Sequence, residues 1–175
     1  MRSPCVFKAS VVALILFLQA CSPALNWREV RVDSAPLLAL FPCRPDQGVQ
    51  SVTLGARVVK MTMMGCEAGG SIFTLTKVDR SLTADDEALI ALWRVGTLTS
   101  MKGVQTSQAP FLLKNAASNP TPLQLRAAGK RADGSPVVLQ AAWFALGPAL
   151  YQVAVYADSD NNAAVQTYFE GLRVE

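Results

Sequence analysis

The sequence predicts an α+β fold in which an antiparallel sheet meander carries a central helix and a C-terminal helix packed on it. Short apolar runs between turn residues fill residues 37–78 and return over 123–157, and both stretches alternate with the two-residue period of strands. A segment with helical spacing separates these two stretches, and another closes the chain. Because strands and helices come in separate blocks, we expect helices packed on a sheet.

The first strand block is predicted to be a meander because turn signals interrupt it repeatedly. Between residues 57 and 64, Val59, Met61 and Met63 share one face, which we expect to meet the core. The turn signals are Phe41-Pro42, Asp46-Gln47-Gly48, Leu54-Gly55 and Gly69-Gly70.

A central helix is predicted to begin at Thr83, which resembles an N-cap because three acidic residues follow it. Leu89, Leu92 and Trp93 recur at helical spacing and should form one buried stripe. The helix is expected to end near the glycine of Lys102-Gly103.

The segment between this helix and residue 123 contains three prolines, which predict a long exposed loop. Two hairpins follow, and in the second strand Trp143 and Phe144 point to opposite faces, so we expect one helix to cover each face of the sheet. The predicted strands are residues 123–127, 137–146 and 151–157, with turns at Asp133-Gly134 and Gly147-Pro148.

The end of the chain combines a helical pattern with an acidic segment. Asp158, Asp160 and Asn162 copy the first three ligand positions of a calcium loop, but the glycine and the glutamate that such a loop needs later are absent. They are a weak calcium candidate, and we favour a helix cap as their role. The apolar residues of the C-terminal helix are Val165, Tyr168, Phe169 and Leu172.

The N-terminus has the pattern of a bacterial lipoprotein signal. Two basic residues precede an apolar run over residues 11–18, which is too short to cross a bilayer, and Leu18-Gln19-Ala20-Cys21 fits a lipobox. We expect a signal peptide over residues 1–20 and a lipid on Cys21, followed by a tether over residues 21–36, in which Val30 and Val32 can already start a strand. The alternative is an ordinary secretory signal with an incidental cysteine.

A single α/β domain is expected over residues 37–175, with two cysteines left in it. Cys5 would leave with the signal and Cys21 would carry the lipid, so Cys43 and Cys66 remain as a pair. In an oxidising periplasm we expect them to form a disulfide. Free or redox-active thiols are the alternative, which the lack of a C-x-x-C pattern disfavours.

Composition argues against several classes of function. The 16 basic and 13 acidic residues are nearly balanced, which disfavours a nucleic-acid partner. The chain contains no histidine, the commonest general base and transition-metal ligand, so we expect neither an enzyme nor a cofactor. The dense basic group of Arg126 and Lys130-Arg131 is expected to solubilise a loop, with contact to phosphate or a lipid headgroup as the alternative.

Short motifs in a fixed order resemble those of a known family. The chain has Phe-Pro-Cys-Arg-Pro at residues 41–45, Cys-Glu-Ala-Gly-Gly at 66–70, a Tyr-Gln strand within 147–156 and Tyr-Phe-x-x-Leu at 168–172. Over about residues 37–174 this order resembles the PsbP-like α/β/α sandwich, and within it small bacterial envelope lipoproteins of unassigned activity. The resemblance implies a fold, and it assigns no site residues.

Together these features predict a lipid-anchored periplasmic lipoprotein that acts as a non-catalytic binding or accessory module of the cell envelope. Its expected partners are the membrane, through the lipid, and an envelope protein. Ser22 directly follows the cysteine that would carry the lipid. An aspartate at this position favours the inner membrane, so the serine predicts the outer membrane. The alternatives are a small-ligand carrier with a groove between sheet and helix, and a histidine-free hydrolase that acts on envelope material.

Overall fold

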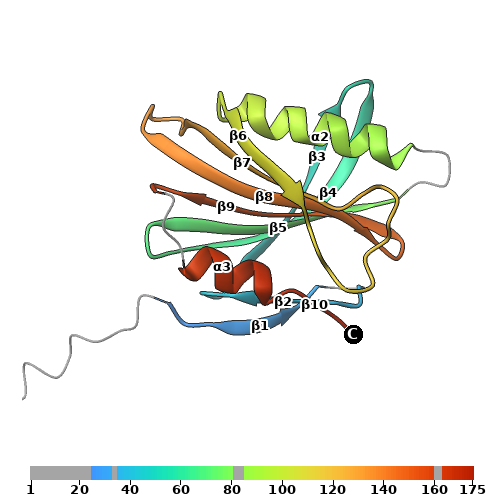
Figure 1. Ribbon diagram of the computed structural model, residues 1–175, viewed down its shortest axis with the longest axis horizontal. Helices are drawn as coiled ribbons and strands as arrows, with labels where there is room; N and C mark the ends of the chain where they lie inside the picture. Colours follow the sequence, from blue (N-terminus) through green and yellow to red (C-terminus); the bar gives the residue numbers. More distant parts are fainter. Residues whose placement is uncertain (1–24, 33–34, 81–84, 160–162) are drawn as a thin grey trace, which may run out of the picture.

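The computed structural model describes residues 25–32, 35–80, 85–159 and 163–175 of the chain. Over these residues the fold is α+β with two helices, as the sequence predicts, but its antiparallel strands form two sheets where one was expected (Figure 1). Neither helix in these ranges is long and apolar enough to span a bilayer.

The elements follow one another with short connections, except between β6 and β7. They are β1 (Arg28–Arg31), β2 (Leu37–Phe41), β3 (Asp46–Leu54), β4 (Arg57–Ala68), β5 (Ser71–Asp79), α2 (Asp86–Ser100), β6 (Val104–Pro110), β7 (Leu123–Lys130), β8 (Pro136–Leu146), β9 (Ala149–Ala157), α3 (Ala163–Glu170) and β10 (Arg173–Val174).

The large sheet consists of two meanders joined side by side. Its strand order is β3-β4-β5-β9-β8-β7-β6, so β5 and β9 meet at the centre although the chain between them forms α2 and three strands. Helix α2 leads from β5 to β6 at the far edge of the sheet (Figure 1). A small sheet of order β1-β2-β10 lies on the side of α3.

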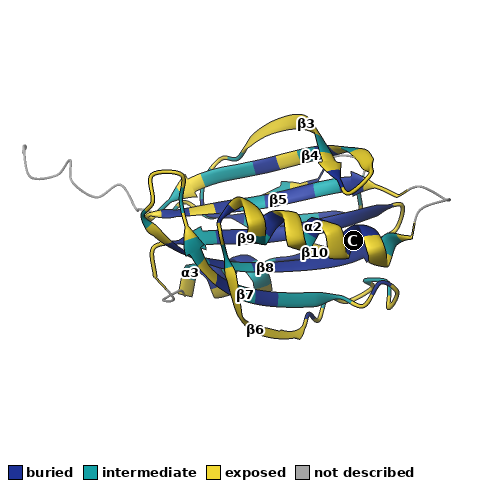
Figure 2. Ribbon diagram, turned by 90° about the horizontal axis from the view of Figure 1, so that it is seen from above, coloured by how far each residue is buried: buried dark blue, intermediate teal, exposed yellow. Residues whose placement is uncertain are grey.

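Each face of the large sheet carries its own apolar core. Trp143 packs in the core that contains Leu89 and Trp93 of α2, whereas its neighbour Phe144 packs in the core that contains Tyr168 of α3. Trp143 and Phe144 are both fully buried, which confirms that one helix covers each face. The central strands are therefore buried on both faces, as Figure 2 shows for β8 and β9.

Strand β4 corrects the expectation of one inner face. Met61 is buried on the side of α2, but Met63 is 37% exposed, and Met64 is buried on the opposite side. The prediction for Met63 is wrong. The sheet has a core on each of its two faces, so a strand near its edge buries some residues on either side and does not bury one whole side.

The folded region begins inside the predicted tether. Residues 28–31 form β1, which pairs antiparallel with β2, and Val32 is only 3% exposed. The tether expected over residues 21–36 is therefore corrected from residue 28 onward. The alternation of Val30 and Val32 is the signal that points to this strand.

Strand β6 forms where the sequence predicts only loop. All seven of its residues are exposed, so no apolar pattern indicates it. Pairing with β7 supplies the backbone hydrogen bonds, and Pro110 stands at the last position, on the outer edge of the sheet, where a missing N–H is tolerated. The prediction of an irregular connection holds for residues 111–122.

Helix α2 starts later than predicted. Asp85 is its N-cap, and its carboxylate accepts hydrogen bonds from the backbone N–H groups of Glu87 and Ala88 at 3.0 and 3.1 Å. Thr83, the predicted cap, lies outside the described residues. Leu92 is 40% exposed and so does not belong to the buried stripe.

Candidate binding groove

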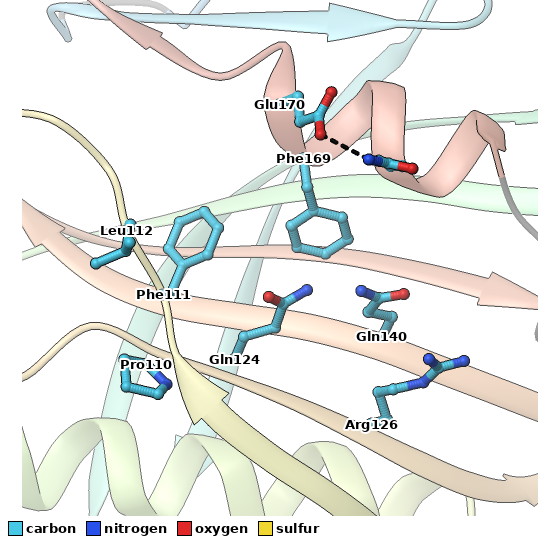
Figure 3. Close-up of a pocket in the computed structure, with 9 residues that line it drawn as sticks. Pro110, Phe111, Leu112, Gln124, Arg126, Gln140, Phe169 and Glu170 are labelled. Atoms are coloured by element: carbon cyan, nitrogen blue, oxygen red, sulfur yellow. Dashed lines mark hydrogen bonds between the residues drawn. The ribbon is translucent and has the colours of Figure 1, made fainter.

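An open groove of about 520 Å³ lies between α3 and the end of β6 (Figure 3). Its floor is formed by side chains of β7 and β8, namely Gln124, Arg126 and Gln140. Phe111 and Phe169 approach each other across it, the first after β6 and the second on α3. The volume falls within the range of small-molecule binding sites.

Strand geometry places the three floor residues on one face. Arg126 lies directly opposite Gln140 in the β7–β8 ladder, and Gln124 is two residues before Arg126, so all three point the same way. This is the face of Phe144 and α3. Helix α3 packs there with Val165 and Tyr168 buried, as predicted, and the polar side chains of β7 and β8 lie beside it.

Aromatic contacts fix the walls. The ring of Phe111 is only 8% exposed and lies 5.7 Å from the ring of Phe144 and 6.1 Å from that of Phe169. The next residue, Leu112, is 92% exposed at the rim. The groove thus has a rigid aromatic side and an apolar side chain available for contact.

The floor and the helix side offer hydrogen-bonding groups. The side-chain amides of Gln124 and Gln140 form no hydrogen bond with any other described residue, so each presents a donor and an acceptor to the groove. Glu170 accepts a hydrogen bond from Gln166 at 2.8 Å, one turn earlier in α3. Such a set can pair with amide or hydroxyl groups of a ligand.

Two neighbouring hollows share lining residues with the groove. One of about 410 Å³ lies under the loop that follows β6 and shares Phe111 and Leu112 with the groove. The other shares Arg126 and Gln140, but its volume of about 10 Å³ leaves room for little more than one water molecule. Only the first hollow adds usable surface next to the groove.

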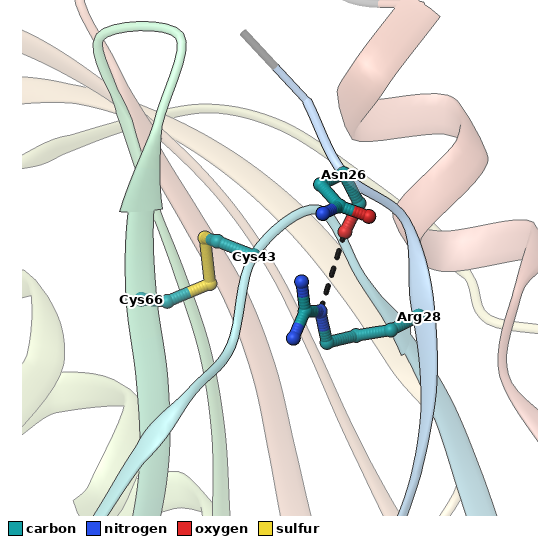
Figure 4. The surroundings of a disulfide bond; sticks show 4 residues. All are labelled: Asn26, Arg28, Cys43 and Cys66. Atoms are coloured by element: carbon teal, nitrogen blue, oxygen red, sulfur yellow. Dashed lines mark hydrogen bonds between the residues drawn. A yellow bond between two sulfur atoms is a disulfide. The ribbon is translucent and has the colours of Figure 1, made fainter. Parts of the chain in front are cut away.

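The predicted disulfide is confirmed. Cys43 and Cys66 are joined with an S–S distance of 2.00 Å and a Cα–Cα distance of 6.0 Å (Figure 4). Cys43 lies between β2 and β3, and Cys66 lies in β4, so the bond ties the small sheet to the large one. The bond is distant in sequence from the groove residues, and its role is to hold the two sheets together.

The other predicted sites have different outcomes. Cys21, Asp160 and Asn162 lie outside the described residues. Asp158 accepts a hydrogen bond from Arg131 at 2.6 Å, and no group of three His, Cys, Asp or Glu residues suited to a metal occurs among the described residues. The basic group is divided, since Arg131 pairs with Asp158 while Arg126 lines the groove.

Sequence reasoning singled out Arg126 and Phe169 but missed most of the other groove residues. Gln124, Gln140 and Phe111 carry no motif, and Leu112 lies in a segment predicted to be a featureless loop. The one available signal is that polar residues interrupt the apolar alternation of β7 and β8. That signal identifies a polar position but does not show which residues surround it.

Comparison with known proteins gives a distant structural similarity. No protein-family model and no curated protein sequence matches the chain. The crystal structure of PA94, a Pseudomonas aeruginosa protein of unknown function, aligns with a TM-score of 0.43 and 12% sequence identity, over 75% of this chain and 83% of that one. A similarity at this level indicates neither the function nor the site.

Proposed function

We propose that the chain is a lipid-anchored periplasmic lipoprotein of the cell envelope, with a PsbP-like sandwich fold, that acts as a non-catalytic binding module. The groove beside α3 is its binding site. The observation that carries the proposal is the combination of Phe111 and Phe169 with the unpaired amides of Gln124 and Gln140. Apolar walls with a few converging polar groups are typical of binding sites.

Two features support the location. The Cys43–Cys66 disulfide is the bond expected in an oxidising compartment. The lipobox at Leu18 to Cys21 supplies the anchor, and Ser22 favours the outer membrane. Since β1 begins at Arg28, an acylated Cys21 would hold the domain within about 25 Å of the membrane surface.

The chemistry of the groove favours a segment of an envelope protein as the ligand. Glutamine amides can pair with a peptide backbone, while Phe169 and the exposed Leu112 can contact its side chains. The neighbouring hollow of about 410 Å³, which shares Phe111 and Leu112 with the groove, extends the surface along which such a segment can lie.

A photo-crosslinking residue in place of Leu112 tests this site in intact cells. The full chain should give one reproducible crosslinked product, because Leu112 is 92% exposed at the rim. The matched control is the same residue at Val95, which is 61% exposed on α2, on the other face of the sheet. Identical products from both positions, or none from Leu112, would contradict the groove as the binding site.

A small-ligand carrier is the second candidate, because the groove volume of about 520 Å³ accommodates a drug-sized molecule. Native mass spectrometry of the full chain from membranes distinguishes the two functions. A carrier would retain a bound mass that the Gln124→Ala/Gln140→Ala variant loses, whereas a module for a protein segment would show the chain mass alone.

A further inference from the structure

We propose that the chain forms a symmetric dimer through the outer edge of β3, which would join two seven-stranded sheets into one. Within the described part of the chain, β3 pairs only with β4 and ends the large sheet. Its nine residues, Asp46 to Leu54, keep one continuous register with β4. A strand of this length at the edge of a sheet presents a row of backbone groups to which a second strand can bind.

The two edges of the sheet differ in their protection. Strand β6 has a register shift between Gln105 and Ser107 and ends on a proline, and Arg94 of α2 donates a hydrogen bond to its Gln108 at 3.1 Å. Bulges and prolines are devices that block edge pairing, and they distinguish the two edges, whereas α2 contacts both edge strands. Strand β3 has no bulge, no proline and no basic residue.

The sequence of β3 is compatible with its own copy. A two-fold axis at Gln50 pairs all nine residues of each strand antiparallel, with Val49 opposite the partner's Ser51. Asp46, the only charged residue of β3, then faces the partner's Leu54, so no like charges meet across the pair. Any other centre leaves residues unpaired.

Exposed apolar side chains lie beside this edge. Val49 is 58% exposed and Val58, on the neighbouring strand, is 72% exposed. Both valines lie on the face of the sheet that carries Met64. Val58, Thr62 and Met64 alternate onto the same side of β4, and Val49 is paired with Thr62. In the dimer the two copies of Val49 lie diagonally across the axis, where β-branched side chains can touch.

The dimer also fits attachment to one membrane. A two-fold axis between antiparallel strands is perpendicular to the sheet, so α3 and the small sheet of both copies face the same way. Strand β1, the described element nearest to Cys21, belongs to that layer (Figure 1). Both lipids would reach the same surface, which raises the effective concentration of the two edges. This membrane step rests on the proposed function, whereas the strand pairing does not.

Cysteine crosslinking of the full chain tests the register. Gln50→Cys places two thiols opposite each other at the axis, within reach of a disulfide, and mild oxidation should give a covalent dimer whose mass map shows the link between the two introduced cysteines. The control Ser107→Cys, on β6, should stay monomeric on the same gel. A covalent dimer with Ser107→Cys and none with Gln50→Cys would overturn the proposal.

Sedimentation of the full chain in detergent tests the equilibrium. Gln50→Lys sets two like charges at the axis and should raise the dimer dissociation constant at least about tenfold. Thr106→Lys on β6 should leave it unchanged. Gln50 is exposed, so circular dichroism should show both variants folded. A wild-type monomer at all concentrations, or an unchanged constant for Gln50→Lys, would overturn the dimer, whereas absence of lipid on Cys21 would overturn only the anchor.

Discussion

At the scale of single residues, Gly171 is the point of closest approach between the end of α3 and the small sheet. A Cβ atom there would lie 2.4 Å from the Cβ of Leu40 and 2.9 Å from the backbone oxygen of Thr167. The Gly171 N–H also donates to that oxygen at 2.9 Å, so the backbone cannot easily retreat. Only a residue without a side chain fits this position.

We therefore expect Gly171→Ala to lower the free energy of unfolding by about 2 kcal/mol, through overpacking against β2. The matched control is Gly96→Ala in α2, where the new atom meets only Leu54 at an ordinary 3.6 Å. It should raise the stability by about 0.5 to 1 kcal/mol, because alanine is the better helix former. Urea unfolding measures both, and equal midpoints for the two variants would contradict this packing.

Two glutamines show what sequence can and cannot resolve at this scale. Gln140 and Gln152 both interrupt apolar strands. Gln152 is 6% exposed and donates to the Thr97 hydroxyl at 3.0 Å, so it is part of a core. Gln140 lines the groove. The sequences around the two glutamines are alike. Gln152 belongs to the core because Thr97 of α2, which is distant in sequence, accepts its hydrogen bond, and the sequence around Gln152 does not reveal this partner.

At the scale of elements, the Cys43–Cys66 bond holds the start of β3 against β4 and β2. It closes a loop of 23 residues in the unfolded chain, which corresponds to about 3 kcal/mol of stabilisation on the chain-entropy account. The Cys43→Ser/Cys66→Ser variant should lose about this amount in urea unfolding. Reductant should destabilise the wild type to the same level and leave the variant unaffected. A reductant effect on the variant would show that the loss arises elsewhere.

Elements with strong local signals are the ones the sequence predicts. The β8–β9 hairpin has long apolar strands and a turn at Gly147, whose φ of +53° favours glycine. Strand β6 has neither an apolar face nor a turn of its own, and it exists because β7 supplies a partner. The start of α2 shifts to Asp85 because several acceptor side chains in succession can cap a helix, and the sequence does not rank them.

At the scale of the whole molecule, two buried tyrosines and the half-buried Tyr156 link stability to alkaline pH. Burial raises the pKa of Tyr151 to about 12, and the negative charge of Asp79 adds to this shift. Burial also raises the pKa of Tyr156, and it raises that of Tyr168, whose hydroxyl donates to the Thr74 oxygen at 2.9 Å, well above the usual value. These hydroxyls therefore stay neutral in the folded state at a pH where the unfolded chain ionises.

Because these pKa values are raised by folding, their contribution is complete below about pH 10, the value for an unfolded tyrosine, and it falls as the pH rises through about 12. We expect the free energy of unfolding to decrease in this window by up to about 1.4 kcal/mol per pH unit for each tyrosine. Urea unfolding between about pH 8 and pH 11 measures the slope. Tyr156→Phe should reduce it, and a flat profile would contradict neutral buried hydroxyls.

The junction between β5 and β9 has a consequence for biogenesis. Residues 71–79 pair with β4 on one side but meet their second partner strand only at 149–157, so a ribosome or a translocation channel must release the chain through residue 157 before the two halves can meet. Until then, Phe73 and Leu75 remain uncovered along an open backbone edge. A nascent or truncated product that ends before residue 149 would thus be a substrate for chaperones and proteases, because one edge of β5 would stay open.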